Sequence, residues 1–348
     1  MVMDAQTMEN PGGNAKIAII ILNWNGRKLL AEFLPSVVKH HNPELSDVIV
    51  ADNGSDDDSV LFLQENFPTV KVWEFDSYFG FAEGYNRALA LAEAYEFVVL
   101  LNSDVAVSSG WDEAMYTAMK NRPEVAAAQP KIRSYVNPEN FEYAGAAGGY
   151  LDKNGYPYCR GRIFNVCETD NGQYDVEADI FWASGACMMV RREDYINAGG
   201  LDRDFFAHME EIDLCWRFHL MGKDVIYVPG ATVYHLGGGS LPAQNPKKTY
   251  LNFRNNLLML HKNLPASTRK KVLLRRRLLD TVAWGKYMLT FDFANANAIL
   301  KAHLDFKKMR KAYNTDPTTD YLPSTPEGRR NILFDFYLRR KRTFGELQ

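Results

Sequence analysis

The sequence predicts an α/β protein built on a mostly parallel central sheet flanked by helices. Short apolar segments typical of buried strands alternate with amphipathic segments typical of helices. Three of those strands end in polar clusters, and open sheets of this class bind their ligands at the carboxyl ends of the strands. The chain of 348 residues, 46% of them hydrophobic, is long enough to bury a core of the required size.

The alternation runs in chain order from residue 16 to residue 104. Strands are predicted at 16–22, 47–52, 70–75 and 97–104, and helices at 26–40, 57–67 and 82–94. Apolar strands separated by amphipathic helices favour a parallel sheet that is covered on both faces. Beyond residue 124 the pattern is strand and loop, with a buried strand predicted at 179–192, a helix at 210–222, and a strand from 224 that leads into a glycine-rich loop.

Charge divides the chain near Pro246. Residues 246–348 contain 22 Lys and Arg against 8 Asp and Glu, whereas residues 1–245 contain 18 against 35. We therefore expect a disordered lead-in at 1–15, an acidic catalytic domain at 16–245 and a basic helical extension at 246–348. A basic extension of this kind favours a polyanionic surface as its partner.

The cysteines and the apolar segments bear on location. Four cysteines form no CxxC pair, which favours reduced thiols, and no basic-then-apolar signal peptide opens the sequence. No apolar run reaches the 18 residues that a membrane span needs. We expect a cytoplasmic protein that does not cross the membrane.

Polar residues at the strand ends are the first candidates for chemistry. Asp52 and the cluster Asn102-Ser103-Asp104 follow two of the predicted strands, and Asn23 follows another. No GxGxxG or GxxxxGK[ST] loop is present to hold a phosphate, so a divalent cation on a carboxylate is the alternative means of neutralising a diphosphate. A single Asp after a strand also serves as an ordinary helix or turn cap.

A second group of candidates lies further along the chain. Glu210, Glu211 and Asp213 stand at the start of a predicted helix, where acids commonly interact with the helix dipole but can also serve as a general base. His235 ends an apolar run and precedes Gly237-Gly238-Gly239. It is either a structural residue or a ligand.

The order of several motifs carries a resemblance over about residues 16–263. These are IIILNWNG, VIVADNGSDD, YFGFAEGYNRAL, VVLLNSDV, FWASGACMMVRRE, FFAHMEEIDLCWR and VYHLGGGS. In this order they resemble the family 2 inverting glycosyltransferases of the Rossmann-like GT-A fold, and particularly their rhamnosyltransferase-like branch.

The resemblance implies a role for each candidate. Asp52 and Asn23 would hold the nucleoside, with Gly80 and Asn86 in the same nucleotide pocket. Asp104 is similar to the last acid of the family's DxD motif, which binds a divalent metal, Mg or Mn. Asn102 replaces the first acid of that motif.

The same resemblance implies that His235 completes the metal site. It also aligns Glu210-Glu211 with the family's Glu-Asp pair, which makes Glu211 the expected base, with Asp213 and Glu210 as alternatives.

The implied reaction moves a sugar from a nucleotide-diphosphate donor, with dTDP-rhamnose suggested by the branch, to a saccharide or polyprenyl-linked acceptor in cell-surface polysaccharide synthesis. The acceptor is expected near residues 141–182. Two other functions stay open: sugar-phosphate nucleotidyl transfer, and a catalytically degenerate nucleotide-sugar-binding scaffold.

The basic extension also has two interpretations. It is either a set of helices packed on the catalytic domain with a solvated basic face, or an interfacial segment on anionic lipid. Nucleic acid is not expected as a partner, because no nucleic-acid module is recognisable and the body is acidic.

Overall fold

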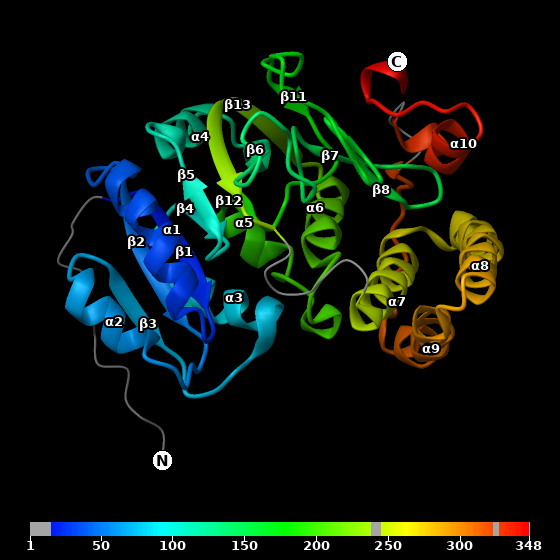
Figure 1. Ribbon diagram of the computed structural model, residues 1–348, viewed down its shortest axis with the longest axis horizontal. Helices are drawn as coiled ribbons and strands as arrows, with labels where there is room; N and C mark the ends of the chain where they lie inside the picture. The colour runs from blue at the N-terminus through cyan, green and yellow to red at the C-terminus, as the bar shows by residue number, and fades with distance from the viewer. Residues whose placement is uncertain (1–14, 238–244, 323–326, 348) are drawn as a thin grey trace.

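The computed structural model describes residues 15–237, 245–322 and 327–347 (Figure 1). The predicted lead-in at 1–15 therefore lies outside the described residues except for its last position, and so does most of the glycine-rich loop that follows His235.

The first half of the central sheet is parallel, as predicted. Its strand order is β3-β2-β1-β4. The strands are β1 (Ile17–Asn23), β2 (Ser46–Asp52), β3 (Lys71–Glu74) and β4 (Phe97–Leu101), joined by the helices α1 (Arg27–His40), α2 (Ser59–Asn66) and α3 (Gly80–Leu91). Each element overlaps the range predicted for it, because strands buried on both faces and amphipathic helices leave clear periodic patterns.

The second half of the sheet is mixed. The order continues β4-β12-β6-β13-β11, with β12 antiparallel to both of its neighbours and β13 parallel to β6. The strands are β5 (Val105–Val107), β6 (Val125–Ser134), β11 (Ala178–Asp179), β12 (Cys187–Arg191) and β13 (Asp224–His235). β5 pairs antiparallel with β13. The strand predicted at 179–192 is interrupted, since only its two ends pair in the sheet.

Both faces of the sheet are covered by apolar layers. Alternate residues of β1 enter different clusters: Ile17, Ile19 and Ile21 pack on one side, and Ala18 and Ile20 pack on the other. This two-residue period is the geometry of a strand buried on both faces. The interior location of β1 explains its continuous apolar sequence.

A small antiparallel sheet lies in the region where the acceptor is expected. Its order is β10-β9-β8-β7, formed by β7 (Gly149–Leu151), β8 (Pro157–Cys159), β9 (Arg162–Ile163) and β10 (Val166–Cys167). Gly149 cannot be replaced easily, because a Cβ there would lie 2.0 Å from the Trp182 ring. Gly149 thus allows the small sheet to pack closely against the segment between β11 and β12.

The remaining helices include the C-terminal group. They are α4 (Trp111–Met119), α5 (Arg192–Asn197), α6 (Glu210–Leu220), α7 (Pro246–Asn263), α8 (Ala266–Leu289), α9 (Phe293–Met309) and α10 (Ile332–Tyr337), with the short 3-10 helices η1 (Arg203–Phe205), η2 (Arg310–Ala312), η4 (Glu327–Arg329) and η5 (Gly345–Leu347). Figure 1 shows α8 and α9 at the edge of the molecule that is remote from β1–β3. Within the described ranges, no helix combines the length and the apolar character needed to cross a membrane.

Candidate active site

The carboxyl ends of β1 and β2 bring two predicted residues together. Asn23 and Asp52 are direct register partners at the ends of these strands, and both are buried. Asn23 donates from Nδ2 to Asp52 Oδ2 at 2.9 Å, and Ser55 donates its hydroxyl to the same oxygen at 2.7 Å. The backbone N–H of Ser55 donates to Oδ1 at 2.8 Å. These bonds hold the Asp52 carboxylate in one orientation at the edge of the sheet.

An exposed aromatic pair stands beside this carboxylate. Trp24 follows Asn23 directly, and its ring centroid lies 4.3 Å from that of Tyr78. Both side chains are about half exposed. Exposed aromatic surface next to a candidate nucleoside site can stack on a flat base. The sequence signal was present in Asn23-Trp24-Asn25, but nothing in it identified Tyr78 as the partner.

Gly80 and Asn86 both lie on α3 but serve different purposes. Gly80 has a φ of +78°, accepts a hydrogen bond from Asn53 Nδ2 at 2.9 Å, and faces the ring of Phe206. Asn86 donates to the carbonyl oxygen of Leu201 at 2.8 Å and accepts from its backbone N–H at 2.9 Å. These bonds use the Asn86 amide to fasten α3 to the segment after α5.

The predicted metal ligands meet where β13 ends. His235 pairs with Val105 in the β13–β5 ladder, one residue from Asp104. Its Nε2 lies 3.2 Å from Asp104 Oδ1, and its Nδ1 lies 3.1 Å from Glu142 Oε2. Burial alone would lower the pKa of His235, but its contacts with the carboxylates of Asp104 and Glu142 outweigh burial and raise the pKa to about 10.

Sequence reasoning missed Glu142. It lies in an irregular segment before the small sheet, and no local pattern relates it to His235. A carboxylate on the far nitrogen of a histidine fixes the ring and leaves the other nitrogen to a ligand.

The donor set fits a divalent cation. Two ligand atoms 3.2 Å apart can both reach an ion at a normal coordination distance of about 2.1 Å. Asp104 supplies a carboxylate oxygen and His235 an imidazole nitrogen. Within the described ranges, this site included, no group of three or more His, Cys, Asp or Glu side chains is arranged to hold a metal, so these two residues would form an incomplete ligand set. Asn102, two residues before Asp104, donates its backbone N–H to Ala186.

Glu210 and Glu211 begin α6 after a strained turn. Phe206, His208 and Met209 all have φ between +67° and +76°, a backbone region that residues other than glycine rarely adopt. Burial raises the pKa of Glu211 to about 7. Burial, together with the neighbouring Glu211 charge, raises the pKa of Glu210 well above its usual value.

Glu211 lies against the segment that bonds to Asn102 at the end of β4. Its Cβ and Cγ lie about 3.8 and 3.9 Å from the position that a Cβ would take on Gly185. The next residue, Ala186, accepts the hydrogen bond from the Asn102 backbone at 3.0 Å. The segment 185–186 therefore connects the start of α6 with the end of β4.

Residues of α7 hold the strained turn in place. Asn255 donates from Nδ2 to the carbonyl oxygens of Phe205, Ala207 and His208 at 2.9, 2.9 and 2.7 Å. Arg254 donates to the carbonyl of Phe205 at 2.9 Å. The candidate base is thus positioned by a helix from the basic extension, a connection that no local pattern in the sequence reveals.

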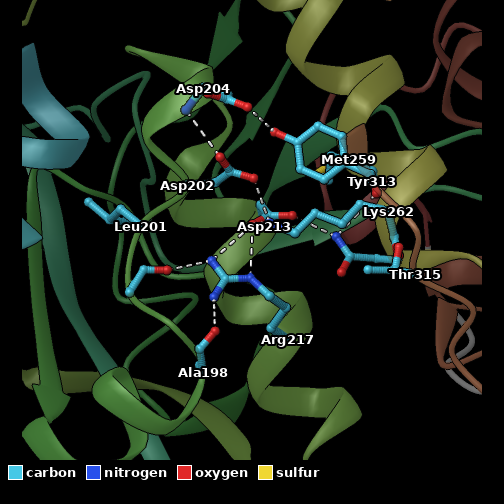
Figure 2. A network of polar contacts seen from close by, with 12 residues as sticks. Ala198, Leu201, Asp202, Asp204, Asp213, Arg217, Met259, Lys262, Tyr313 and Thr315 are labelled. Atoms are coloured by element: carbon cyan, nitrogen blue, oxygen red, sulfur yellow. Dashed lines mark hydrogen bonds and ion pairs between the residues drawn. The ribbon is translucent and has the colours of Figure 1, made fainter. Parts of the chain in front are cut away.

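Asp213 occupies a different environment from Glu211. It is fully buried, and its Oδ2 lies 2.9 Å from both Arg217 and Lys262, while Asn263 donates to Oδ1 at 2.7 Å (Figure 2). Lys262 also pairs with Asp202 at 2.8 Å. Burial would raise the pKa of Asp213, but Arg217 and Lys262 together lower it. Asp213 therefore joins α6 to α7, and its oxygens are already engaged.

Comparison with known proteins identifies the family of the chain. The family profile described as Glycosyl transferase family 2 matches residues 18–198. The N-acetylglucosaminyl-diphospho-decaprenol L-rhamnosyltransferase of Mycobacterium tuberculosis is 27% identical over 236 residues, 63% of this chain and 75% of that protein. The rhamnosyltransferase WbbL of Escherichia coli is 39% identical over 54 residues, which are 16% of this chain and 20% of WbbL.

Solved structures show the same fold. GalNAc-T7 with UDP, GalNAc and Mn²⁺ aligns with a TM-score of 0.56 at 14% identity, over 72% of this chain and 48% of that one. The mannosyltransferase PcManGT from Pyrobaculum calidifontis, in complex with GDP-Man and Mn²⁺, aligns with a TM-score of 0.50 at 16% identity, over 89% and 79%. These similarities confirm the predicted GT-A fold class.

Proposed function

Because the chain belongs to glycosyl transferase family 2, we propose that it transfers a sugar from a nucleotide-diphosphate donor to an acceptor hydroxyl with inversion at the anomeric carbon. One observation carries this proposal. Asp104 and His235 meet where β5 pairs with β13, and Glu211, with a pKa of about 7, lies against Gly185, next to the Ala186 that bonds to Asn102. This combines a site for a diphosphate-bound cation with a general base.

The donor is proposed to be dTDP-rhamnose, and the acceptor a saccharide on a polyprenyl diphosphate. The support comes from the names of two relatives, a decaprenol-linked L-rhamnosyltransferase and WbbL, and from the similarity to an O-antigen biosynthesis protein of Myxococcus xanthus, 26% identical over 231 residues. A product of this kind would enter a cell-surface polysaccharide. A polyprenyl carrier is confined to lipid, so we place the enzyme on the cytoplasmic face of the membrane.

The nucleotide is proposed to bind at the ends of β1 and β2. Asp52 and Asn23 would contact the nucleoside, and Trp24 would stack on its base together with Tyr78. Gly80 has a positive φ and faces the Phe206 ring of the turn that precedes Glu210. A side chain at Gly80 would strain the backbone and would lie 3.4 Å from the Phe206 ring.

Asp104 and His235 would hold Mg²⁺ or Mn²⁺, with Asn102 beside them. The cation would supply positive charge against the diphosphate of the donor. Glu142 would keep the His235 ring oriented through Nδ1.

Glu211 is proposed as the base. Its carboxylate would accept the proton of the acceptor hydroxyl while that oxygen forms a bond to the anomeric carbon and the bond to the diphosphate breaks. Burial and the neighbouring Glu211 charge raise the pKa of Glu210 well above its usual value, which favours its protonated form. Asp213, which two cations already engage, would serve structure.

The experiment is a transfer assay with dTDP-rhamnose, Mn²⁺ and a short-chain polyprenyl-diphosphate-linked N-acetylglucosamine. We expect the acceptor to gain one deoxyhexose by mass spectrometry, with the anomeric configuration opposite to that of the donor by NMR. Glu211→Gln should abolish the product, whereas Glu193→Gln, an exposed acid in the first turn of α5, should not. Retention of configuration would contradict single displacement.

A further inference from the structure

Helix α8 exposes apolar side chains on its outer face. Leu274, Leu278, Val282 and Leu289 are between 61% and 82% exposed. At 100° per residue they fall within one narrow sector of the helix. Helices of globular proteins normally bury such a stripe.

The inner face of the same helix buries charge. Arg276 and Asp280 are both buried and pair at 3.2 Å. Arg276 also donates to the carbonyl oxygen of Asn154 at 3.2 Å, and His303 of α9 lies 3.1 Å from Asp280. These partners fix the rotation of α8 about its axis. The apolar stripe therefore cannot turn inward without breaking a buried ion pair.

The apolar surface continues past the end of α8. Phe291 lies in the turn between α8 and α9, and Phe293 begins α9, with 80% and 56% of their surfaces exposed. Phe291 holds a φ of +57°, and its N–H donates to the carbonyl oxygen of Met288. Figure 1 shows α8 at the outer edge of the helical group.

Cations border the stripe, and the acid of α8 is buried. Lys270 and Arg277 lie on one side of the stripe and Lys286 on the other, and all three are exposed. None of the three forms an ion pair with a carboxylate that the structure describes. Asp280 is the acidic residue of α8, and it faces inward.

We propose that this outer face, formed by Leu274, Leu278, Val282, Leu289 and Phe291 with the cations Lys270, Arg277 and Lys286, binds an anionic lipid bilayer. The apolar side chains would enter the boundary between headgroups and acyl chains, and the cations would contact the anionic headgroups. A second copy of the chain would place like charges opposite each other. The inference deepens the proposed function, on which its purpose rests, because a polyprenyl-linked acceptor resides in such a bilayer.

The test is flotation of the purified full-length chain with vesicles of phosphatidylcholine, alone or mixed with phosphatidylglycerol, in the absence of donor and acceptor. We expect binding to the anionic vesicles, weak binding to the neutral ones, and release by high salt. The double variant Leu278→Gln/Leu289→Gln should lower binding to anionic vesicles at least tenfold. Arg277→Gln should weaken binding less and make it less sensitive to salt.

Leu61→Gln is the matched control, because Leu61 is a comparably exposed leucine on α2. It should bind vesicles like the wild type. Equal loss in Leu61→Gln, or no flotation of the wild type with anionic vesicles, would overturn the proposal. A concentration-dependent dimer in sedimentation experiments that Leu278→Gln/Leu289→Gln abolishes, without vesicle binding, would assign the face to a second copy instead.

Transfer to a water-soluble acceptor separates this inference from the proposed function. The variants of α8 should retain that transfer, since none of the substituted side chains touches the candidate active site. Vesicle binding without any sugar transfer would contradict the proposed function and leave the lipid surface supported. Sugar transfer without vesicle binding would support the proposed function and contradict the lipid surface.

Discussion

Nε2 of His235 lies 3.2 Å from Oδ1 of Asp104, although the two residues come from distant parts of the chain. The ladder between β13 and β5 produces this contact, since it pairs His235 with the residue after Asp104. Glu142 faces the other ring nitrogen at 3.1 Å. The imidazole is thus placed between two carboxylates.

This placement predicts that Mn²⁺ affinity depends on pH. His235 has a pKa of about 10, so without metal it is protonated at neutral pH. A metal ligand must be a neutral imidazole, and binding therefore displaces one proton. We expect the affinity to rise by up to about tenfold per pH unit from pH 7 to 9, as measured by Mn²⁺ titration with electron paramagnetic resonance.

Glu142→Gln provides the control for that titration. Removal of one carboxylate lowers the pKa of His235, so the affinity of this variant should stop rising at a lower pH. An affinity that is independent of pH in the wild type would contradict the assignment of His235 as a ligand.

Substitution of Glu211 should affect catalysis more than donor binding. Glu211→Gln removes the proton acceptor, and we expect kcat to fall by about 10²–10⁴-fold with a small change in KM for the donor. In the wild type, kcat should rise with pH to a plateau above about pH 7, because the base must be ionised. Glu211→Asp should retain part of the activity, and an unchanged kcat in Glu211→Gln would remove Glu211 from its role.

Substitution of Asp213 should affect stability. Asp213→Asn leaves Arg217 and Lys262 without their buried partner, so we expect the free energy of unfolding to fall by about 3 kcal/mol in urea denaturation. The surface acid Glu124, which pairs with Arg122, is the control, and Glu124→Gln should cost less than about 0.5 kcal/mol.

The Asp213 effect should also depend on pH. The pKa of Asp213 is lower in the folded chain than its ordinary value of 3.8. Its contribution is therefore fully present above about pH 4 and is lost as the pH falls below that value. A stability difference between wild type and Asp213→Asn that persists undiminished at the lowest accessible pH would contradict the ion-pair account.

Asn255 and Asn256 are adjacent buried residues that hold different loops. Asn255 bonds to the turn before Glu210, whereas Asn256 donates to the carbonyl oxygen of Gly155 at 2.7 Å. Asn255→Ala should relax the strained turn and lower kcat by about tenfold or more. Asn256→Ala should lower stability but leave kcat per folded molecule within about twofold. An equal loss of kcat in the two variants would contradict a specific role of Asn255 in positioning the turn.

Much of this fold follows from local sequence patterns. The strands β1 to β4 and the helices between them could be predicted, because a strand buried on both faces is continuously apolar and its crossover helices are amphipathic. The strand predicted at 179–192 was too long, since residues 180–186 lie outside β11 and β12; among them, Ser184 donates its N–H to the side chain of Gln129. β5 and α4 are short and left no comparable pattern.

The site could be predicted only in part. The predicted ends of the strands gave the positions of Asp52 and Asp104, because the carboxyl ends of parallel strands lie at the same edge of a sheet. Glu142 and Asn255 act across long sequence distances, and no periodicity encodes such contacts. Asp213 was predicted from the sequence as an alternative base. However, Arg217 follows it by four residues, and this spacing favours an ion pair on one face of a helix.

The most direct test of the account measures nucleoside diphosphate release from a panel of UDP-, GDP- and dTDP-sugars with Mg²⁺ or Mn²⁺, in the wild type and in Asp104→Ala and Glu211→Gln. We expect the wild type to release nucleoside diphosphate from one donor, and only when metal is present. Asp104→Ala should lose this release. If one donor binds equally well to the wild type and to Asp104→Ala but no sugar is ever released, the chain is a nucleotide-sugar-binding scaffold and the metal assignment is wrong.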